Sequence, residues 1–280
     1  MIIDFHTHIF PEAVRQQREA YFEDEPAFEL LYDSPRARIA GAQEIVSTMD
    51  AQGVDRSVVF GFPWKSMETM RMHNDYILDA VKRFPERLIG LCCLDPGHPE
   101  AVTEARRCLK EGLCGLGELA FYDTGFTPAI LEQLQPLMAL CREADVPVLI
   151  HTNEPVGHAY PGKSPVTLAE IYRLIQAFPA NKIVLAHWGG GLFLFHLLKK
   201  ETKAALKNVY FDTAASPYLY DPDIYRIAAD IVTPEKILFG SDYPLLPPNR
   251  YFDEMHRGGL SASEIRTVSG LNATQLLKLD

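Results

Sequence analysis

The chain has 280 residues, of which 47% are hydrophobic and 23% charged, and its formal net charge is −10. This acidity works against nonspecific binding to nucleic acid or anionic lipid, and no apolar run approaches the roughly 20 residues of a membrane span. Composition and length are those of a soluble enzyme, so we expect one domain over residues 1–280. A small-molecule substrate is then the expected partner.

Cysteines and the N-terminus indicate the cellular compartment. The chain has five cysteines, an odd number without C-x-x-C spacing, and all of them lie in apolar strand or helix patterns. Reduced, buried thiols are the simplest interpretation. Asp4 follows Met1 too closely to leave a charged n-region and an apolar h-region. We therefore expect a cytoplasmic protein.

Short apolar runs alternate with helical patterns along the whole chain. The runs are nearly continuous, which is typical of strands that are covered on both faces. They are residues 2–6, 57–61, 87–94, 113–118, 147–151, 182–187, 208–212 and 236–241. Helical patterns cover residues 42–52, 68–84, 100–111, 136–144, 167–178, 192–207, 222–231 and 261–277.

This alternation predicts a single-domain (β/α)8 TIM barrel. An open, doubly wound sheet is the alternative, but no G-x-G-x-x-G follows the first strand. Three connections, residues 9–41, 152–166 and 243–260, are too long for simple turns and follow strands 1, 5 and 8. Barrel enzymes build their sites on loops at this face, so all three are candidate lids or specificity loops, although the first could equally be a packing cover. His158 and Lys163 of the second loop are candidate substrate-binding residues.

Five of the apolar runs end in, or lead directly into, a residue that can bind a divalent metal. A lone histidine after a strand is more often a hydrogen-bonded structural residue, but barrel closure would bring all five ends to one mouth. Nitrogen and oxygen donors suit zinc and its divalent neighbours. The candidates are His6 and His8, two apart and on one face of the first strand, and then Glu118, His151, His187 and Asp242.

The segment Asp4-Phe5-His6-Thr7-His8, with the later strand ends in this order, resembles the amidohydrolase superfamily of metal-dependent barrels. Residues 187–191 (HWGGG) and 239–244 (FGSDYP) resemble its amidohydrolase-2 branch, which includes aminocarboxymuconate semialdehyde decarboxylases and hydrolase relatives. The resemblance implies that His6, His8, His151 and Asp242 bind one divalent ion, with zinc as the first expectation. It also implies that His187 polarises the substrate or assists proton transfer, and it allows a homodimer.

Glu118 departs from this pattern, because Gly117-Glu118 is similar to the TatD-like nucleases of the same superfamily. A second ion bridged by Glu118 therefore stays open. Chemistry alone suggests related roles. A metal with an open position lowers the pKa of bound water from 15.7 to about 7, and Asp242 can act as general base and then acid. A neutral His187 could instead donate to an oxyanion, and Trp188 either floors the pocket or packs against a helix.

We expect a metal-dependent hydrolase that cleaves an amide, ester or lactone of a small carboxylated molecule. A nonoxidative decarboxylase is the alternative. Glu118 and the absence of an obvious decarboxylase signature favour hydrolysis. A TatD-like nuclease is weaker, because the chain is acidic and has no basic cluster for phosphate, and a noncatalytic metal-binding protein is the last option.

Overall fold

The computed structural model describes residues 1–279. Its described part contains eight strands, and every pair of neighbours is parallel. In chain order they are β1 (Ile3–His8), β2 (Arg56–Phe60), β3 (Leu88–Gly90), β4 (Leu116–Leu119), β5 (Val148–Ile150), β6 (Ile183–Leu185), β7 (Val209–Asp212) and β8 (Ile237–Leu238). Strands β1 to β3 form one ladder and β4 to β8 another.

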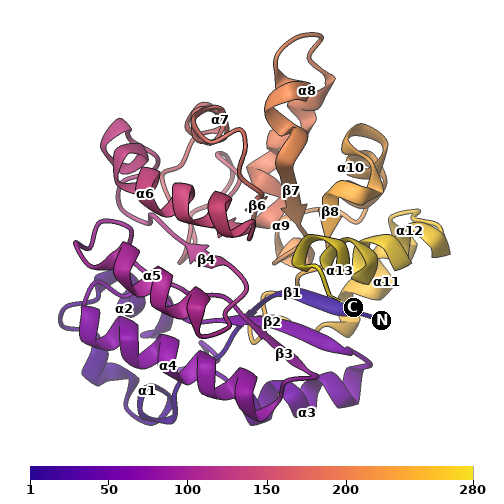
Figure 1. The fold of residues 1–280 in the computed structure, drawn as a ribbon. Coiled ribbons are helices and arrows are strands. Elements are labelled where there is room, and N and C mark those ends of the chain that lie inside the picture. The colour runs from indigo at the N-terminus through magenta and orange to yellow at the C-terminus, as the bar shows by residue number, and fades with distance from the viewer. Residues whose placement is uncertain (280) are drawn as a thin grey trace.

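Two isolated bridges close these ladders into a barrel. Cys92 pairs with Leu116 between the third and fourth strands, and Thr7 pairs with Tyr243 between the first and the last. The amide of Phe5 also donates to the carbonyl oxygen of Phe239 at 2.7 Å. The predicted (β/α)8 fold is confirmed, with the strands at the centre and the helices around them (Figure 1).

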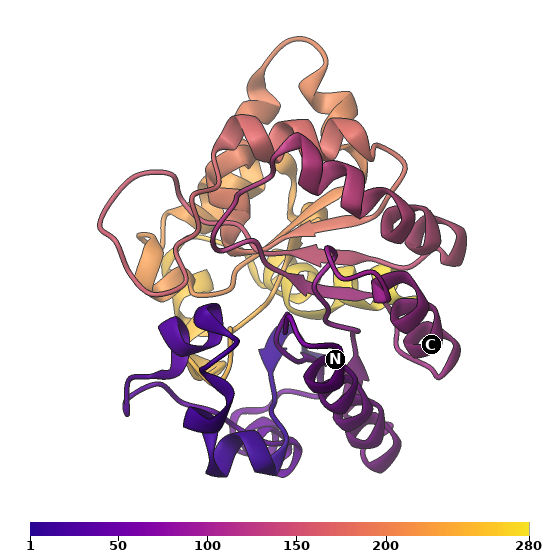
Figure 2. The same cartoon turned by 90° about the vertical axis from the view of Figure 1, so that its left-hand side faces the viewer.

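Helices surround the strands and also fill two of the three long connections. The helices are α1 (Glu12–Gln16), α2 (Pro26–Tyr32), α3 (Ala42–Gln52), α4 (Met67–Arg83), α5 (Ala101–Lys110), α6 (Pro128–Ala144), α7 (Leu168–Ala177), α8 (Thr202–Ala205), α9 (Ser216–Leu219), α10 (Ile224–Val232), α11 (Asn249–Arg257), α12 (Ala262–Arg266) and α13 (Asn272–Leu277). Helix α8 projects beyond the ring of helices in both views (Figures 1 and 2). None of the described helices combines the length and apolar character needed to cross a membrane.

The apolar core has two layers. Side chains from strands on opposite sides of the barrel, among them Phe5, Phe60 and Val184, contact one another and fill its interior. A larger cluster lies between the strands and the surrounding helices. Both faces of each strand are therefore buried, which explains the continuous apolar runs in the sequence.

Three of the predicted helices differ from the structure, and two of them lie before the last strand. Pro136 was expected at a helix start, but it lies inside α6, which begins at Pro128 with the Thr127 hydroxyl capping the amide of Ile130. The predicted helix over residues 192–207 is replaced by an irregular 3₁₀ segment, η2 (His187–Leu197), and the four-residue α8. Residues 188–191 have positive φ, so the backbone cannot enter an α-helix there.

The predicted C-terminal helix over residues 261–277 is divided by a π-helical turn, Thr267–Leu271. A capping box forms its start, with the Ser261 hydroxyl accepting from the amide of Glu264 at 3.3 Å. All five cysteines are free thiols, as expected, but Cys114 is only partly buried.

Candidate metal centre and cavity

The C-terminal ends of the strands bring six predicted residues together in one cluster. Asp242 Oδ1 lies 3.5 Å from His6 Nε2 and 3.4 Å from His8 Nε2. Glu118 is at the centre, with its Oε1 atom 3.0 Å from His151 Nδ1 and 3.7 Å from His187 Nε2. The same carboxylate reaches His6 Nε2 at 3.8 Å and His8 Nε2 at 3.9 Å.

Each histidine ring is oriented by an acceptor outside this cluster. His6 Nδ1 lies 2.8 Å from Asp212 Oδ2, and His187 Nδ1 lies 2.9 Å from the carbonyl oxygen of Ala214. Carboxylate and carbonyl oxygens only accept, so these nitrogens carry the hydrogen and Nε2 presents its lone pair to the cluster. His6 Nε2 is buried and has no hydrogen-bond partner in the described chain.

The other two rings follow the same rule. His8 Nδ1 lies 3.4 Å from the carbonyl oxygen of Gly61, and His151 Nε2 lies 2.9 Å from that of Gly162. His8 Nε2 and His151 Nδ1 therefore face the two carboxylates of the cluster as acceptors. Acceptors that face acceptors at these distances require a proton or a cation between them.

The pKa values of the cluster show the same need for a proton or cation, because the carboxylates favour protonated histidines and the histidines favour an ionised Asp242. Burial by itself would lower the pKa of His6, but the nearby Asp212 and Glu118 carboxylates outweigh it and raise the value to about 10. For His187, burial is likewise outweighed by Glu118 and Asp242, and the pKa rises to about 9. Burial would raise the pKa of Asp242, but the His8 hydrogen bond and the neighbouring histidines hold it at about 2. Positive charge is stabilised at this point of the barrel.

The donor atoms fit a divalent metal, and they fall into three overlapping groups. Within each group the ligand atoms lie within 4.8 Å of one another. The groups are His6, His8 and Glu118, then His6, His187 and Asp242, and then Glu118, His151 and His187. Imidazole and carboxylate donors without a thiolate suit zinc, manganese and related ions. His151 is not grouped with His8 or Asp242, whereas Glu118 belongs to two groups.

Asp212 is a functional residue that the sequence analysis missed. Besides the bond to His6, its Oδ1 atom accepts from the backbone amides of His187 at 2.9 Å and Ala214 at 3.0 Å. It thus fixes two of the histidines that face the cluster. The signal was present, because the apolar run at residues 208–212 also ends in an aspartate.

Asp4 has a supporting role outside the cluster. Its carboxylate accepts from the Ser241 amide at 2.8 Å and from the Ser241 hydroxyl at 2.5 Å. These bonds tie the start of β1 to the segment that carries Asp242. Burial raises the pKa of Asp4 to about 7 despite these hydrogen bonds.

Two glycines allow the cluster to form. Gly117 precedes Glu118 with a φ of 134°, and a Cβ atom at this position would lie 2.6 Å from the backbone oxygen of Leu149. At Gly190, a Cβ atom would lie 2.2 Å from the backbone oxygen of Asn153. Close approach of the neighbouring backbone therefore requires glycine at both positions.

A cavity of about 580 Å³ opens above the cluster. His8, Glu118, His151, His187 and Asp242 contribute to its lining. Much of the remaining wall is aromatic or basic, namely Tyr32, Phe62, Tyr122, Tyr160, Tyr218, Arg36, Arg38 and His158. This volume suits a small molecule that carries one aromatic ring.

Of the three predicted substrate contacts, only His158 lines this cavity. Trp188 is fully buried and donates to the Ser216 hydroxyl at 3.0 Å, so it packs against the helical layer. Lys163 binds Glu154 at 2.8 Å instead of facing the cavity. The loop around residue 163 folds back on itself, which residue spacing alone does not reveal.

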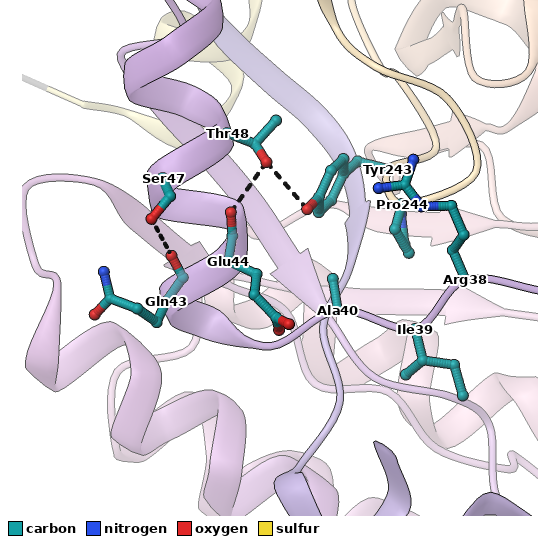
Figure 3. A pocket seen from close by; sticks show the side chains of 9 residues that line it. All are labelled: Arg38, Ile39, Ala40, Gln43, Glu44, Ser47, Thr48, Tyr243 and Pro244. Carbon is teal, nitrogen blue, oxygen red and sulfur yellow. Dashed lines mark hydrogen bonds between the residues drawn. The ribbon is translucent and has the colours of Figure 1, made fainter. Parts of the chain in front are cut away.

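A second cavity of about 340 Å³ lies beside α3 and the segment after β8 (Figure 3). Its side chains include Thr48, whose hydroxyl donates to that of Tyr243 at 3.1 Å, and Arg38, which lines both cavities. The one carboxylate there, Glu44, is paired with Arg15 at 2.8 Å. This cavity holds none of the grouped metal donors.

Residues 3–279 match the amidohydrolase-2 family. The chain belongs to this family. It is 25% identical over 303 residues to a gamma-resorcylate decarboxylase from Polaromonas sp. strain JS666, covering 88% of this chain and 90% of that protein. It is 24% identical over 261 residues to a 2-amino-3-carboxymuconate-6-semialdehyde decarboxylase from Dictyostelium discoideum, covering 80% and 71%.

Solved structures share the fold. A 5-carboxyvanillate decarboxylase from Sphingomonas paucimobilis superposes with a TM-score of 0.77 at 19% identity, covering 100% of this chain and 99% of that one. A 2,6-dihydroxybenzoate decarboxylase complexed with 2,6-dihydroxybenzoate gives a TM-score of 0.74 at 18% identity and 99% coverage of both chains. A manganese complex of the 5-carboxyvanillate decarboxylase from Novosphingobium aromaticivorans gives 0.76 at 18% identity, covering 100% and 96%.

These comparisons show that the chain is an enzyme of the metal-dependent amidohydrolase superfamily. They contradict the prediction of hydrolysis, because the similar enzymes are decarboxylases. The error has a physical reason. Hydrolases and decarboxylases of this superfamily share the barrel and the metal donors, so Glu118 alone does not distinguish the two reactions.

Proposed function

We propose that the protein is a metal-dependent, nonoxidative decarboxylase of a small aromatic carboxylic acid. Similarity to gamma-resorcylate decarboxylase over 88% of the chain carries this proposal. The cavity supports it, because its metal donors lie among aromatic side chains that suit a flat ring. No oxidant is required by such a reaction.

The relatives and the cavity wall both support one substrate class. A second relative, a 6-methylsalicylic acid decarboxylase from Penicillium expansum, is 33% identical over 89 residues. Its substrate and gamma-resorcylate both carry a hydroxyl beside the carboxyl group. Two tyrosines of the cavity wall, Tyr32 and Tyr122, can offer their hydroxyls to ring substituents. We therefore propose an ortho-hydroxybenzoate as substrate.

The metal centre would be built from His6, His8, Glu118, His151 and Asp242. When bound, it supplies the positive charge that holds the substrate carboxylate and the neighbouring oxygen. Manganese is the first ion to test, because solved decarboxylases of this fold contain it and the donor set has no thiolate. Zinc is the matched comparison. Two of the three donor groups share Glu118, and His151 belongs only to the group that contains His187, so we propose room for a second ion on Glu118, His151 and His187.

Proton transfer is assigned to Asp242. The bond between the ring and the carboxyl carbon breaks, its electron pair stays on the ring carbon, and carbon dioxide leaves. Asp242 lines the cavity, and with its pKa at about 2 it starts as the carboxylate. It takes a proton from solvent and gives that proton to the ring carbon as the bond to the carboxyl carbon breaks. His187 binds Ala214 through Nδ1, and with a pKa of about 9 its Nε2 carries a hydrogen at neutral pH when no ion is bound to it. We therefore keep the predicted role of His187 as a donor to the substrate oxygen.

Carbon dioxide release tests this function directly. The purified protein is freed of metal, loaded with manganese or zinc, and given 2,6-dihydroxybenzoate, salicylate, 6-methylsalicylate or 5-carboxyvanillate. We expect metal-dependent release from at least one of these acids and none from benzoate, which lacks the hydroxyl. Full metal occupancy with no carbon dioxide from any hydroxylated acid would refute the proposal.

A further inference from the structure

The loop between β5 and α7 is closed at its base. Asn153 Oδ1 accepts from the amide of Ser164 at 2.8 Å and from its hydroxyl at 2.7 Å, and Asn153 Nδ2 donates to the Ser164 carbonyl oxygen at 3.2 Å. Both residues are buried. The ten residues between them therefore form a loop with fixed ends.

Lys163 holds the interior of this loop. Its ammonium group donates to Glu154 Oε1 at 2.8 Å, to the Val156 carbonyl oxygen at 2.6 Å and to the His158 carbonyl oxygen at 3.2 Å. The other oxygen of Glu154 accepts from the Tyr160 hydroxyl at 2.8 Å. Three bonds use all three donors of a lysine, so Lys163 has none left for a substrate.

This ion pair is shielded from water. The side chains of Lys163 and Glu154 are 15% and 16% exposed, although the loop tip at Val156 is 72% exposed. A shielded pair with additional hydrogen bonds is worth more than a surface ion pair, and breaking one partner leaves the other unsatisfied. The pair therefore restrains the whole loop.

The restrained loop reaches the metal centre through one atom. Gly162, next to Lys163, presents its carbonyl oxygen to His151 Nε2 at 2.9 Å. This contact keeps the hydrogen on Nε2. Nδ1, which lies 3.0 Å from Glu118 Oε1, is then the ring nitrogen whose lone pair can bind a metal. The loop also places His158, Tyr160 and Gly162 on the cavity wall.

We propose that Lys163 and Glu154 form a clamp that holds the Gly162 carbonyl against His151 and thereby sets the affinity of the centre for its ion. Both are positioning residues, since neither touches the cluster. The inference rests on the proposed metal centre but not on the reaction, so it is tested by metal binding rather than by turnover.

Lys163→Met is the decisive variant, because two explanations predict opposite signs. Removing a positive charge near a cation site should strengthen metal binding through electrostatics alone. Loss of the clamp should weaken it by about 10- to 100-fold, the usual effect of losing a group that orients a ligand. Lys163→Arg, which keeps the ion pair, should stay near the parent value.

Manganese affinity is measured by competition with a chelator, and the visible spectrum of the cobalt-loaded protein reports the ligand geometry. Glu154→Gln is an isosteric second variant, and combined with Lys163→Met it should weaken binding no more than the stronger single change. Lys110→Met, on exposed α5 surface, is the control and should change nothing. Thermal unfolding of each metal-free variant establishes that the fold is kept.

Unchanged or tighter manganese binding by Lys163→Met, with an unchanged cobalt spectrum, would overturn the clamp while leaving the proposed function intact. A parent protein that binds no divalent ion would overturn the metal centre and the clamp together. If Lys163→Met does not fold, Glu154→Gln decides through the cobalt spectrum, which a change of charge alone would not alter.

Discussion

Replacing Asp242 with asparagine separates the proposed proton donor from the rest of the site. The amide keeps the shape of the side chain near His6 Nε2 and His8 Nε2, at 3.5 and 3.4 Å in the parent, but it has no acidic proton. General acid–base assistance typically contributes about 10²- to 10⁴-fold. At about 1.36 kcal/mol per tenfold change, this corresponds to about 2.7 to 5.4 kcal/mol in the activation barrier. We therefore expect kcat for carbon dioxide release to fall at least about a hundredfold.

The measurement needs metal occupancy beside the rate, because Asp242 also belongs to a donor group. Manganese is raised until elemental analysis shows the same occupancy in variant and parent, and kcat is then compared at saturating substrate. Asp253→Asn, an exposed aspartate on α11, is the control and should retain the parent rate. A variant with full occupancy and kcat within about tenfold of the parent would refute the assignment.

Three further predictions concern the metal centre. Because two donor groups share Glu118, the parent protein should bind two equivalents of manganese from excess metal, and the Glu118→Gln variant should bind one. One equivalent in both proteins would mean that Glu118 lies beside a single ion. Replacing His6 and His8 together with alanine should abolish metal binding but keep the circular dichroism of the barrel, whereas unfolding would make the ion structural. The pKa values of about 10 for His6 and about 9 for His187 mean that metal binding must release their protons. Manganese affinity should therefore rise from pH 6 to 9, by up to about tenfold per pH unit for each proton displaced. Calorimetry in two buffers counts those protons, and an affinity independent of pH would contradict this reasoning.

The barrel was predictable because its strands are buried on both faces. Continuous apolar runs mark such strands, and their ends locate His151, His187 and Asp242 at one mouth once the barrel closes. The helix over residues 42–52 has the bounds that its apolar spacing predicted. Local pattern and fold agree at these positions.

The remaining differences arise from contacts between segments distant in sequence. Pro136 was read as a helix start, yet the earlier cap at Thr127 begins that helix, and tertiary packing accommodates the proline. Lys163 carries a charge typical of a substrate contact, but its three donors are used within its own loop. Asp212 has its role only because the end of strand β7 lies beside His6 of β1 and His187, which follows β6.

The reaction itself was the harder inference, since one donor set serves more than one chemistry. A carbon–carbon bond that breaks and a carbon–hydrogen bond that forms leave a different isotopic record from hydrolysis. The most direct measurement is therefore turnover of 2,6-dihydroxybenzoate by the manganese-loaded protein in deuterium oxide and, separately, in oxygen-18 water. Product incubated without enzyme corrects for spontaneous exchange. We predict one carbon dioxide per substrate, deuterium at the ring carbon that bore the carboxyl group, and no oxygen-18 in the aromatic product. Oxygen-18 in that product, or turnover without carbon dioxide, would contradict the account.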